Sequence, residues 1–421
     1  MVKRPSWKVT VVGVMAAEPL IVQDHTILSA GGKRKTVREQ TLTRTLDRYD
    51  RSPHLVFWET TKTCALACQH CRASAQLEAL PGELTTAEGR LLIDQIADMD
   101  GATPILVFTG GDCLAREDLS ELITHARARG LRLGIAPSVT ERLTREVLEN
   151  LYELGVRSIS ISLDGADAAS HDSLRGVEGH FDQTIAALEM MRDIGYRVQV
   201  NTTVMRRNAR ELADVLALLR SAGVKIWEVF FLVGVGRGRD VLEVTPEDAE
   251  DICHFLVDAT SFDMTVRTVE GPFFRRVQSQ RAMDPGADHL DAEDAGELYR
   301  ELRARLDRET PSTAGTKRSA TIATGDGRGV IFVGFDGEVH ASGFLPLSLG
   351  NVRSEPLGTI YTQHPLLTSI RSGALEGECG RCEYRRLCGG SRARSYAATG
   401  RVLGDDPACL RTPTRLTLLS V

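Results

Sequence analysis

The sequence lacks an excess of positive charge and lacks a long apolar segment. Its 421 residues carry a formal net charge of −6, so no global basic field favours nucleic acid or an anionic membrane surface. The longest apolar stretch near the start, residues 9–17, is too short to span a bilayer and has no flanks of a secretory signal. We therefore expect a cytoplasmic protein with no nucleic-acid partner and no membrane partner.

The remaining composition is that of a folded protein, with 42% apolar and 26% charged residues. The length exceeds that of one ordinary core and indicates two or three domains. Nine cysteines are an odd number, and seven of them form two groups. These are Cys64, Cys68 and Cys71, and then Cys379, Cys382, Cys388 and Cys409. In a reducing compartment such groups indicate metal or redox chemistry more often than disulfides.

From residue 53, short apolar segments alternate with longer segments of helical period. The expected strands are residues 54–58, 104–108, 131–135, 157–163, 198–204 and 225–232. The expected helices include residues 87–99, 119–129, 143–154, 181–194 and 209–222. Strand alternating with helix predicts parallel pairing through right-handed crossovers. The expected fold class is α/β, a partial (β/α)6 TIM-type barrel whose chemistry lies at the carboxyl ends of the strands.

Four segments are expected along the chain. Residues 1–52 form an N-terminal appendage with short strands at 8–14 and 20–23, and residues 53–275 form the barrel. Residues 276–328 form a bridging segment, rich in Pro, Gly and charge, with a helix near 294–306. Residues 329–421 form a cysteine-rich domain that opens with a hairpin at Asp336-Gly337. Thr85, Thr86 and Thr245 precede acidic residues and are expected helix N-caps.

The first cysteine group follows the first expected strand with the spacing C-x3-C-x2-C. Three thiolates on one short loop can hold three irons of a 4Fe–4S cube and leave the fourth iron open to a chelating substrate. A purely electron-carrying cluster would normally have a fourth cysteine, and none lies near Cys71. The alternatives are a zinc site or buried thiols, but zinc usually takes four ligands at other spacings.

Here the sequence resembles the radical S-adenosylmethionine (SAM) superfamily over residues 53–275. The resemblance implies that SAM binds at consecutive strand ends. Its implied contacts are His70 beside the adenine, Gly110, Gly111 and Asp112 at the amino group, Ser162 and Asp164 at the ribose, Arg175 at the methionine carboxylate, and Ser138, Asn201 and the turn from Gly234 along the same pocket. The family more often has Glu where this chain has Asp112. Taken singly, the motifs also fit turns or a surface ion pair, but their order on successive strands favours a site.

The second cysteine group has the spacing C-x2-C-x5-C-x20-C, which can ligate one cube completely, with a structural zinc site as the alternative. It resembles the SPASM/Twitch extensions of radical SAM enzymes. Full SPASM domains carry two auxiliary clusters, but Ser342 and Arg392 stand here where ligands of one of them are common. The resemblance therefore implies two 4Fe–4S clusters in this chain, one SAM-binding and one auxiliary.

Residues 343–409 also resemble enzymes of the alternative haem pathway, which remove propionate carboxyls from iron porphyrins, and peptide maturases such as the mycofactocin maturase. The resemblance implies an enzyme that reductively cleaves SAM to a 5′-deoxyadenosyl radical and oxidises its substrate after hydrogen-atom abstraction. A carboxylated cofactor precursor such as a haem intermediate and a ribosomally made peptide remain alternative substrates. An electron donor such as flavodoxin or ferredoxin is implied.

A non-catalytic iron–sulfur or zinc protein is the third hypothesis. It predicts a closed first cluster, which the missing fourth cysteine disfavours. Between the first two hypotheses, a wide planar cavity with basic rims would favour a porphyrin, and an exposed strand edge would favour a peptide.

Three further features have alternative roles. Cys113 follows Asp112 and is either near the active site or a buried inert thiol. Cys253 lies in an expected helix and is predicted to pack in the core. The segment Phe273-Phe274-Arg275-Arg276 closes the barrel region, where it either contacts an anionic substrate or forms a packed edge.

Overall fold

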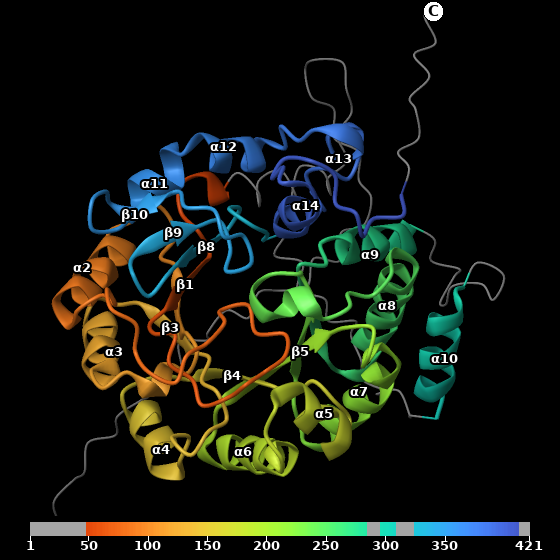
Figure 1. Cartoon of the computed structure of the whole chain (residues 1–421), viewed down its shortest axis with the longest axis horizontal. Coiled ribbons are helices and arrows are strands. Elements are labelled where there is room, and N and C mark those ends of the chain that lie inside the picture. Colours follow the sequence, from red (N-terminus) through yellow and green to blue (C-terminus); the bar gives the residue numbers. More distant parts are fainter. Residues whose placement is uncertain (1–47, 284–294, 309–323, 412–421) are drawn as a thin grey trace, which may run out of the picture.

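A computed structural model describes residues 48–283, 295–308 and 324–411. Helices form a ring around a curved sheet when the molecule is viewed down its shortest axis (Figure 1). The expected strands at 8–14 and 20–23 and most of the N-terminal appendage lie outside the described residues. In the described part of the chain, no helix combines the length and the apolar character needed to cross a membrane.

The main sheet consists of seven consecutive parallel strands, each paired with the next. They are β1 (Leu55–Glu59), β2 (Ile105–Thr109), β3 (Arg132–Ile135), β4 (Ser158–Ser162), β5 (Arg197–Val204), β6 (Ile226–Phe231) and β7 (Thr265–Val269). On the other side of β1 follow β8 (Val330–Val333), which is parallel to it, and the antiparallel β9 (Glu338–His340) and β10 (Gly350–Asn351). Within the described strands β7 and β8 are not paired, so the barrel is open between them.

The helices lie outside the sheet. Those of the barrel are α2 (Thr86–Ala97), α3 (Leu119–Ala128), α4 (Arg145–Glu153), α5 (Ala168–Arg175), α6 (His180–Ile194), α7 (Leu212–Ser221), α8 (Pro246–Ala259) and α9 (Phe273–Met283). Later helices are α10 (Glu297–Leu306), α11 (Leu357–Gln363), α12 (Pro365–Ser372), α13 (Gly377–Arg381) and α14 (Arg392–Thr399). Figure 1 shows α13 and α14 between α12 and α9, on the side where the barrel is open.

Side chains along each strand point alternately outward, against the helices, and inward, into a hollow interior. Val56 and Trp58 of β1 point outward and are fully buried against the helices. Trp58 lies so close to Gly89 of α2 that a Cβ there would be 2.6 Å from its ring. The inward positions of β3 and β4 include Gly134, Ser158 and Ser160, which are small, whereas barrels of this type usually fill the interior with bulky residues. The interior of the barrel therefore has space for a ligand.

The sequence-based fold class is confirmed, with one strand more than expected. Six predicted strands agree with β1–β6 to within one or two residues, and β7 was missed. The predicted hairpin at Asp336-Gly337 is confirmed by the antiparallel β8–β9 pair. Thr85 is an N-cap whose side chain accepts from the Glu88 N–H, and Thr245 caps α8. The expectation for Thr86 was wrong, because it is the first helical residue and its hydroxyl donates to Asp118.

The C-terminal part of the chain continues the barrel sheet. β8 belongs to the predicted segment 329–421, yet it pairs with β1 over four residues. Helix α10 falls within the helix expected near 294–306 and packs against α8 and α7. The proposed four-segment division remains a prediction, and the sheet crosses its last boundary.

Candidate functional site

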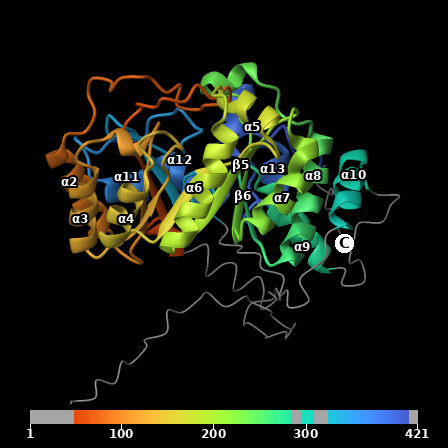
Figure 2. The ribbon, with the colours of Figure 1, turned by 90° about the horizontal axis from the view of Figure 1, so that it is seen from below.

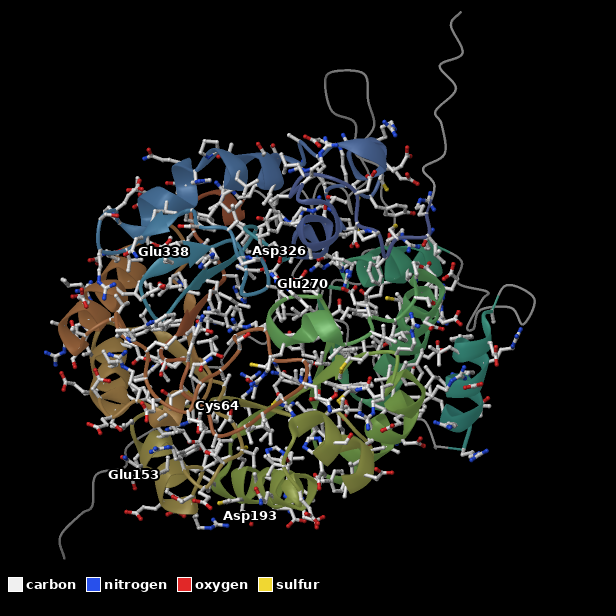
Figure 3. The ribbon with its side chains drawn as sticks, in the orientation of Figure 1. Cys64, Glu153, Asp193, Glu270, Asp326 and Glu338 are labelled. Carbon is white, nitrogen blue, oxygen red and sulfur yellow. The ribbon has the colours of Figure 1, made fainter. Side chains whose placement is uncertain are left out.

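The barrel encloses a cavity of about 550 Å³, a size typical of small-molecule and cofactor pockets. It runs from the first residues of the strands, such as Leu55 and Arg197, to the loops at their carboxyl ends. Cys64, Cys68 and Cys71 line it, and so does Cys388 of the C-terminal segment. Figure 2, a side view, shows the orange loop after β1 along the upper edge of the barrel. In Figure 3, Cys64 lies within the ring formed by the helices.

The first cysteine group is brought together in one small cluster. Cys64 and Cys68 are buried with Leu66, and Cys71 packs against them. The Cys71 N–H donates to the Cys68 carbonyl at 3.3 Å, and burial raises the pKa of the Cys64 thiol. As the structure stands, no three His, Cys, Asp or Glu side chains of the described residues are arranged to hold a metal ion. The donor set itself, three thiols on one loop, fits a cluster with one open iron.

Glycines allow neighbouring loops to hold the cysteine loop by its backbone. The Gly111 N–H donates to the Thr61 carbonyl at 2.8 Å, and the Asp112 N–H donates to the Thr63 carbonyl at 2.7 Å. A Cβ on Gly111 would lie 2.5 Å from the Thr63 carbonyl oxygen, closer than atoms can approach. The loop after β6 makes a similar contact, since Gly236 has a φ of +56° and faces the Cys71 and Arg72 carbonyls.

We therefore expect Gly111→Ala to displace the cysteine loop and to lower the iron content of the reconstituted protein by about the content of one cluster, roughly four irons. Iron analysis after anaerobic reconstitution measures this loss. Gly358→Ala is the matched control, because a Cβ at Gly358 would meet only Met99, at 3.9 Å. Full iron in the folded Gly111→Ala protein would show that the loop does not need this close approach.

Three of the residues expected around SAM form one ionic group. Arg175 Nη2 lies 2.6 Å from Asp164 Oδ2, and His70 Nε2 lies 3.2 Å from the same oxygen. Burial opposes ionisation of Asp164, but the Arg175 guanidinium and His70 hold the pKa of this carboxyl below its usual range. Arg175 Nη1 also approaches Cys68 Sγ at 3.5 Å. The ionic group thus lies directly beside the cysteine loop.

A chain of two buried histidines, which the sequence analysis missed, supports Asp164. The Asp164 N–H donates to His171 Nδ1 at 3.1 Å, so His171 carries its proton on Nε2. That nitrogen lies 2.8 Å from His180 Nδ1, and His180 Nε2 lies 2.9 Å from the Val139 carbonyl. Burial lowers the pKa of His171 to about 3, so the ring stays neutral. The hydrogen bonds tie the strand ends of β3 and β4 together.

Most of the other expected SAM contacts also line the cavity. The expected residues on the cavity wall are His70, Gly110, Gly111, Ser138, Ser162, Arg175 and Asn201. Asp112 is buried and does not line it, because its carboxylate accepts from the backbone of Leu114 and Ser138 and from the Thr140 hydroxyl. Asp164 and Gly234 likewise lie behind the wall. The assigned roles remain predictions.

We expect Asp164→Ala to weaken SAM binding by roughly 10- to 100-fold without removing iron, because buried charged hydrogen bonds are worth about 1.5–3 kcal/mol. An anaerobic SAM titration of the reconstituted protein measures the change. Asp182→Ala, which removes an exposed carboxylate from the first turn of α6, is the control. Unchanged SAM affinity in Asp164→Ala would remove this carboxylate from the site.

Apart from the SAM-site residues, the cavity wall is rich in basic and aromatic side chains. Arginines of the wall are Arg72, Arg197, Arg237, Arg267, Arg275, Arg328 and Arg392, and its phenylalanines are Phe57, Phe230, Phe231, Phe332 and Phe344. Arg72 lies 4.6 Å from the Phe332 ring centroid. Burial, followed by the charge of Arg275, lowers the pKa of Arg328 to about 10, so it is still a cation at neutral pH. Arg267, which lies on the unexpected β7, and Arg328, which precedes β8, were not predicted from the sequence.

The second cysteine group lies around one acidic loop. The Cys379 N–H donates to Asp405 Oδ1 at 2.7 Å, and the Cys409 N–H donates to the Asp406 carbonyl at 3.1 Å. Burial raises the pKa of Cys388 to about 12, with smaller contributions from Asp406 and Cys409. Cys388 alone of the four lines the cavity. The four thiols match the donor set of one completely ligated cube.

Ser342 and Arg392, the two positions expected to have lost cluster ligands, both make hydrogen bonds within the protein. Ser342 Oγ donates to Glu270 Oε1 at 3.4 Å, and Ser391 Oγ donates to Glu270 Oε2. Burial and the Asp326 carboxylate raise the pKa of Glu270 well above its usual value. Glu270 and Asp326 lie next to each other in Figure 3, by the C-terminal segment. Arg392 donates instead to the Val402 and Gly404 carbonyls.

The three features with alternative roles are now placed. Cys113 and Cys253 are both fully buried in the hydrophobic core, as inert thiols would be, and burial raises the pKa of each. Phe273 and Phe274 are buried in the same core, as a packed edge requires. In the same segment, however, Arg275 lines the cavity.

The fold and the cavity define the class of the protein: a barrel enzyme with a three-thiol loop at the carboxyl ends of its strands. Residues 58–219 match the model of the radical SAM superfamily. The chain is 36% identical over 381 residues to the AdoMet-dependent heme synthase of Nitratidesulfovibrio vulgaris, covering 89% of this chain and 96% of that protein. It is 35% identical to the protein of the same name from Methanosarcina barkeri, covering 86% and 97%. The chain belongs to the radical SAM superfamily.

Membership identifies an enzyme that uses a 4Fe–4S cluster and SAM. The fold agrees with a solved relative, SuiB of Streptococcus suis bound to the precursor peptide SuiA. That structure matches with a TM-score of 0.62 at 14% sequence identity, covering 91% of this chain and 84% of the other. At this identity the likeness shows the fold alone.

Proposed function

We propose that this enzyme oxidatively decarboxylates propionate side chains of an iron porphyrin. The observation that carries the proposal is a single cavity lined by Cys64, Cys68 and Cys71 of the first cysteine group and by Cys388 of the second. A substrate in this cavity would meet the SAM site and the C-terminal cysteines at the same time. The two relatives at 36% and 35% identity are named heme synthases, which supports the same substrate class.

The cavity wall favours a porphyrin over a peptide. Aromatic rings such as Phe57 and Phe344 suit a flat macrocycle, and the surrounding guanidinium groups suit carboxylates. A peptide would be expected to add a strand to an open sheet edge. One end of the sheet is β10, which is only two residues long, and at the other end Arg394 already donates to the Glu270 carbonyl just after β7.

When bound, a 4Fe–4S cluster with SAM supplies the 5′-deoxyadenosyl radical that takes a hydrogen atom from an unactivated carbon. The chain holds the reactants. Arg175 and Asp164 are proposed to exchange their mutual ion pair for contacts with the methionine carboxylate and the ribose. His70, on the cavity wall, is proposed to pack beside the adenine. The reacting carbon would lie inside the barrel cavity, where the chain positions it against the bound SAM.

The overall reaction requires an electron acceptor. Conversion of one propionate to a vinyl group removes one hydrogen atom from the carbon next to the ring, releases CO2 and leaves one electron. Cys379, Cys382, Cys388 and Cys409 are proposed to hold one auxiliary 4Fe–4S cluster for this electron. Ser342 and Arg392 stand where ligands of a further cluster are common, and both make hydrogen bonds within the protein, which supports one auxiliary cluster rather than two. A flavodoxin or ferredoxin is the proposed external electron donor.

The test is an anaerobic assay of the reconstituted enzyme with SAM, a reductant and iron coproporphyrin III, which carries four propionates. Mass spectrometry should show stepwise loss of CO2 and two hydrogens from the porphyrin, matched by 5′-deoxyadenosine. Formation of 5′-deoxyadenosine without any change in the porphyrin would leave the radical SAM assignment intact and contradict the proposed substrate.

A further inference from the structure

Two arginines lie within electrostatic range of each other at the opening of the barrel. Arg275 comes from the start of α9, on the β7 side, and Arg328 lies two residues before β8, on the other side. Both line the cavity. Arg275 reaches across the opening, because its guanidinium donates to the Thr324 carbonyl and, at 3.4 Å, to the Leu387 carbonyl. Arg328 Nη1 donates to the Arg386 carbonyl at 2.7 Å.

Neither guanidinium is neutralised by an ion pair within the described residues. The recorded partners of both are backbone carbonyls, which carry no net charge. Arg328 is only 5% exposed, and its Nε is a buried donor without a hydrogen-bond acceptor in the described structure. Burying an uncompensated cation is costly, and burying two together costs more. The arrangement is favourable when an anion binds between them.

Two acidic groups lie nearby, and each is held by hydrogen bonds from uncharged donors. Asp326 lies within electrostatic range of Arg275, but its Oδ2 accepts from the backbone N–H groups of Arg392 and Ala393 at the start of α14. The Glu270 carboxyl accepts from Ser342 and Ser391. Among the described residues neither carboxyl group forms an ion pair with Arg275 or Arg328, so both guanidinium groups, which lie at the barrel opening with Cys388, are available to a further anion.

We infer that Arg275 and Arg328 form a carboxylate-binding site that seats one propionate of the substrate at the barrel opening. The inference rests on the proposed function and adds the residues that recognise the substrate. Guanidinium groups bind carboxylates through paired N–H donors. A propionate bound here fixes the macrocycle between the SAM site and Cys388, both of which border the same cavity.

The test compares two probes, iron coproporphyrin III and its tetramethyl ester, which has the same ring without the negative charges. Reconstituted wild-type enzyme should prefer the carboxylate form, and Arg275→Gln/Arg328→Gln should lose roughly 10- to 100-fold of this preference. Arg275→Lys should keep part of it, because charge remains without the paired donors. Arg145→Gln, at an exposed position on α4, is the charge-removal control and should keep all of it.

The outcomes separate the two proposals. If the wild type binds neither porphyrin, the proposed function is wrong and the carboxylate site falls with it. If the wild type binds porphyrin and the double variant keeps the full carboxylate preference, the carboxylate site is wrong while the proposed function stands. A double variant that keeps the carboxylate preference but loses the iron bound by the four C-terminal cysteines would show that the two arginines support that metal site. This result would overturn the inference.

A measurement on the wild type covers the case of a variant that does not fold. An arginine-selective dicarbonyl reagent should modify Arg275 or Arg328 in the reconstituted enzyme, and iron coproporphyrin III should protect both, as judged by peptide mass spectrometry. Equal modification with and without the porphyrin would overturn the inference.

Discussion

Replacing Cys64, Cys68 and Cys71 together by Ala is expected to abolish SAM cleavage completely. These thiols lie together on the loop after β1 and border the cavity. Without them no iron is left to chelate SAM, and the uncatalysed route to the radical is negligible at ambient temperature. The iron content after reconstitution should fall from about eight to about four per chain, because each of the two cysteine groups is expected to hold one four-iron cluster. Iron analysis and a 5′-deoxyadenosine assay measure both effects.

Cys113→Ala is the matched control for this triple replacement. Cys113 directly follows Gly111 and Asp112, whose backbone holds the cysteine loop. Its thiol is nevertheless fully buried in the hydrophobic core and does not line the cavity. It should keep full iron and full 5′-deoxyadenosine formation, with a moderate loss of stability from the small cavity it leaves. If the triple variant kept about eight irons, the assignment of the first cluster would be wrong.

The sequence predicted the barrel well because each of its strands has a strong local signal. Apolar and β-branched runs at 104–108 and 157–163 lie between long helical periods, and the strands β2 and β4 form there. β7 was missed because its interior position is Arg267, a charged residue that interrupts the apolar pattern. The residue faces the cavity, so the local departure from the strand pattern reflects the site and not a failure of the fold.

The residues of the candidate site also fall into those that the sequence predicted and those that it did not. Positions that act through type and spacing, such as Cys64 and Arg175, were predicted from motifs and do lie together. Asp112 has the expected residue type but uses its carboxylate to hold the loop. The paired histidines His171 and His180 have no motif of their own, because the link between them depends on how α5 and α6 pack.

The missed arginines depend on tertiary structure. Arg328 precedes a strand that follows the barrel by a long segment of sequence, and only the parallel pairing of β8 with β1 brings it to the cavity. Arg275 was singled out, but the sequence did not decide between a packed edge and an anion contact. The structure supports the first for its phenylalanine neighbours and places Arg275 itself on the cavity wall.

The C-terminal cysteines offer a donor set that fits two chemistries. Cys379 and Cys409 contact the Asp405–Asp406 loop, and the four thiols of the group as a donor set would suit an auxiliary 4Fe–4S cluster or a structural zinc ion. The two differ in what happens when ligands are removed. A structural metal contributes its binding energy to folding, whereas a redox cluster contributes an electron acceptor for the substrate radical.

The variant Cys382→Ala/Cys388→Ala is therefore expected to separate two steps of the reaction. It should still form 5′-deoxyadenosine, because the loop with Cys64 is held by contacts with Gly111 and Gly236 that do not involve the tail. It should form less than a tenth of the oxidised porphyrin that the wild-type enzyme forms, because the electron left by each propionate has no acceptor. Metal analysis, a circular dichroism melt and both product assays on the same sample test this. Zinc at the four C-terminal cysteines of the wild type, together with unfolding of the variant, would identify a structural site. A folded variant with normal porphyrin turnover would exclude electron transfer through these cysteines, whatever metal they hold.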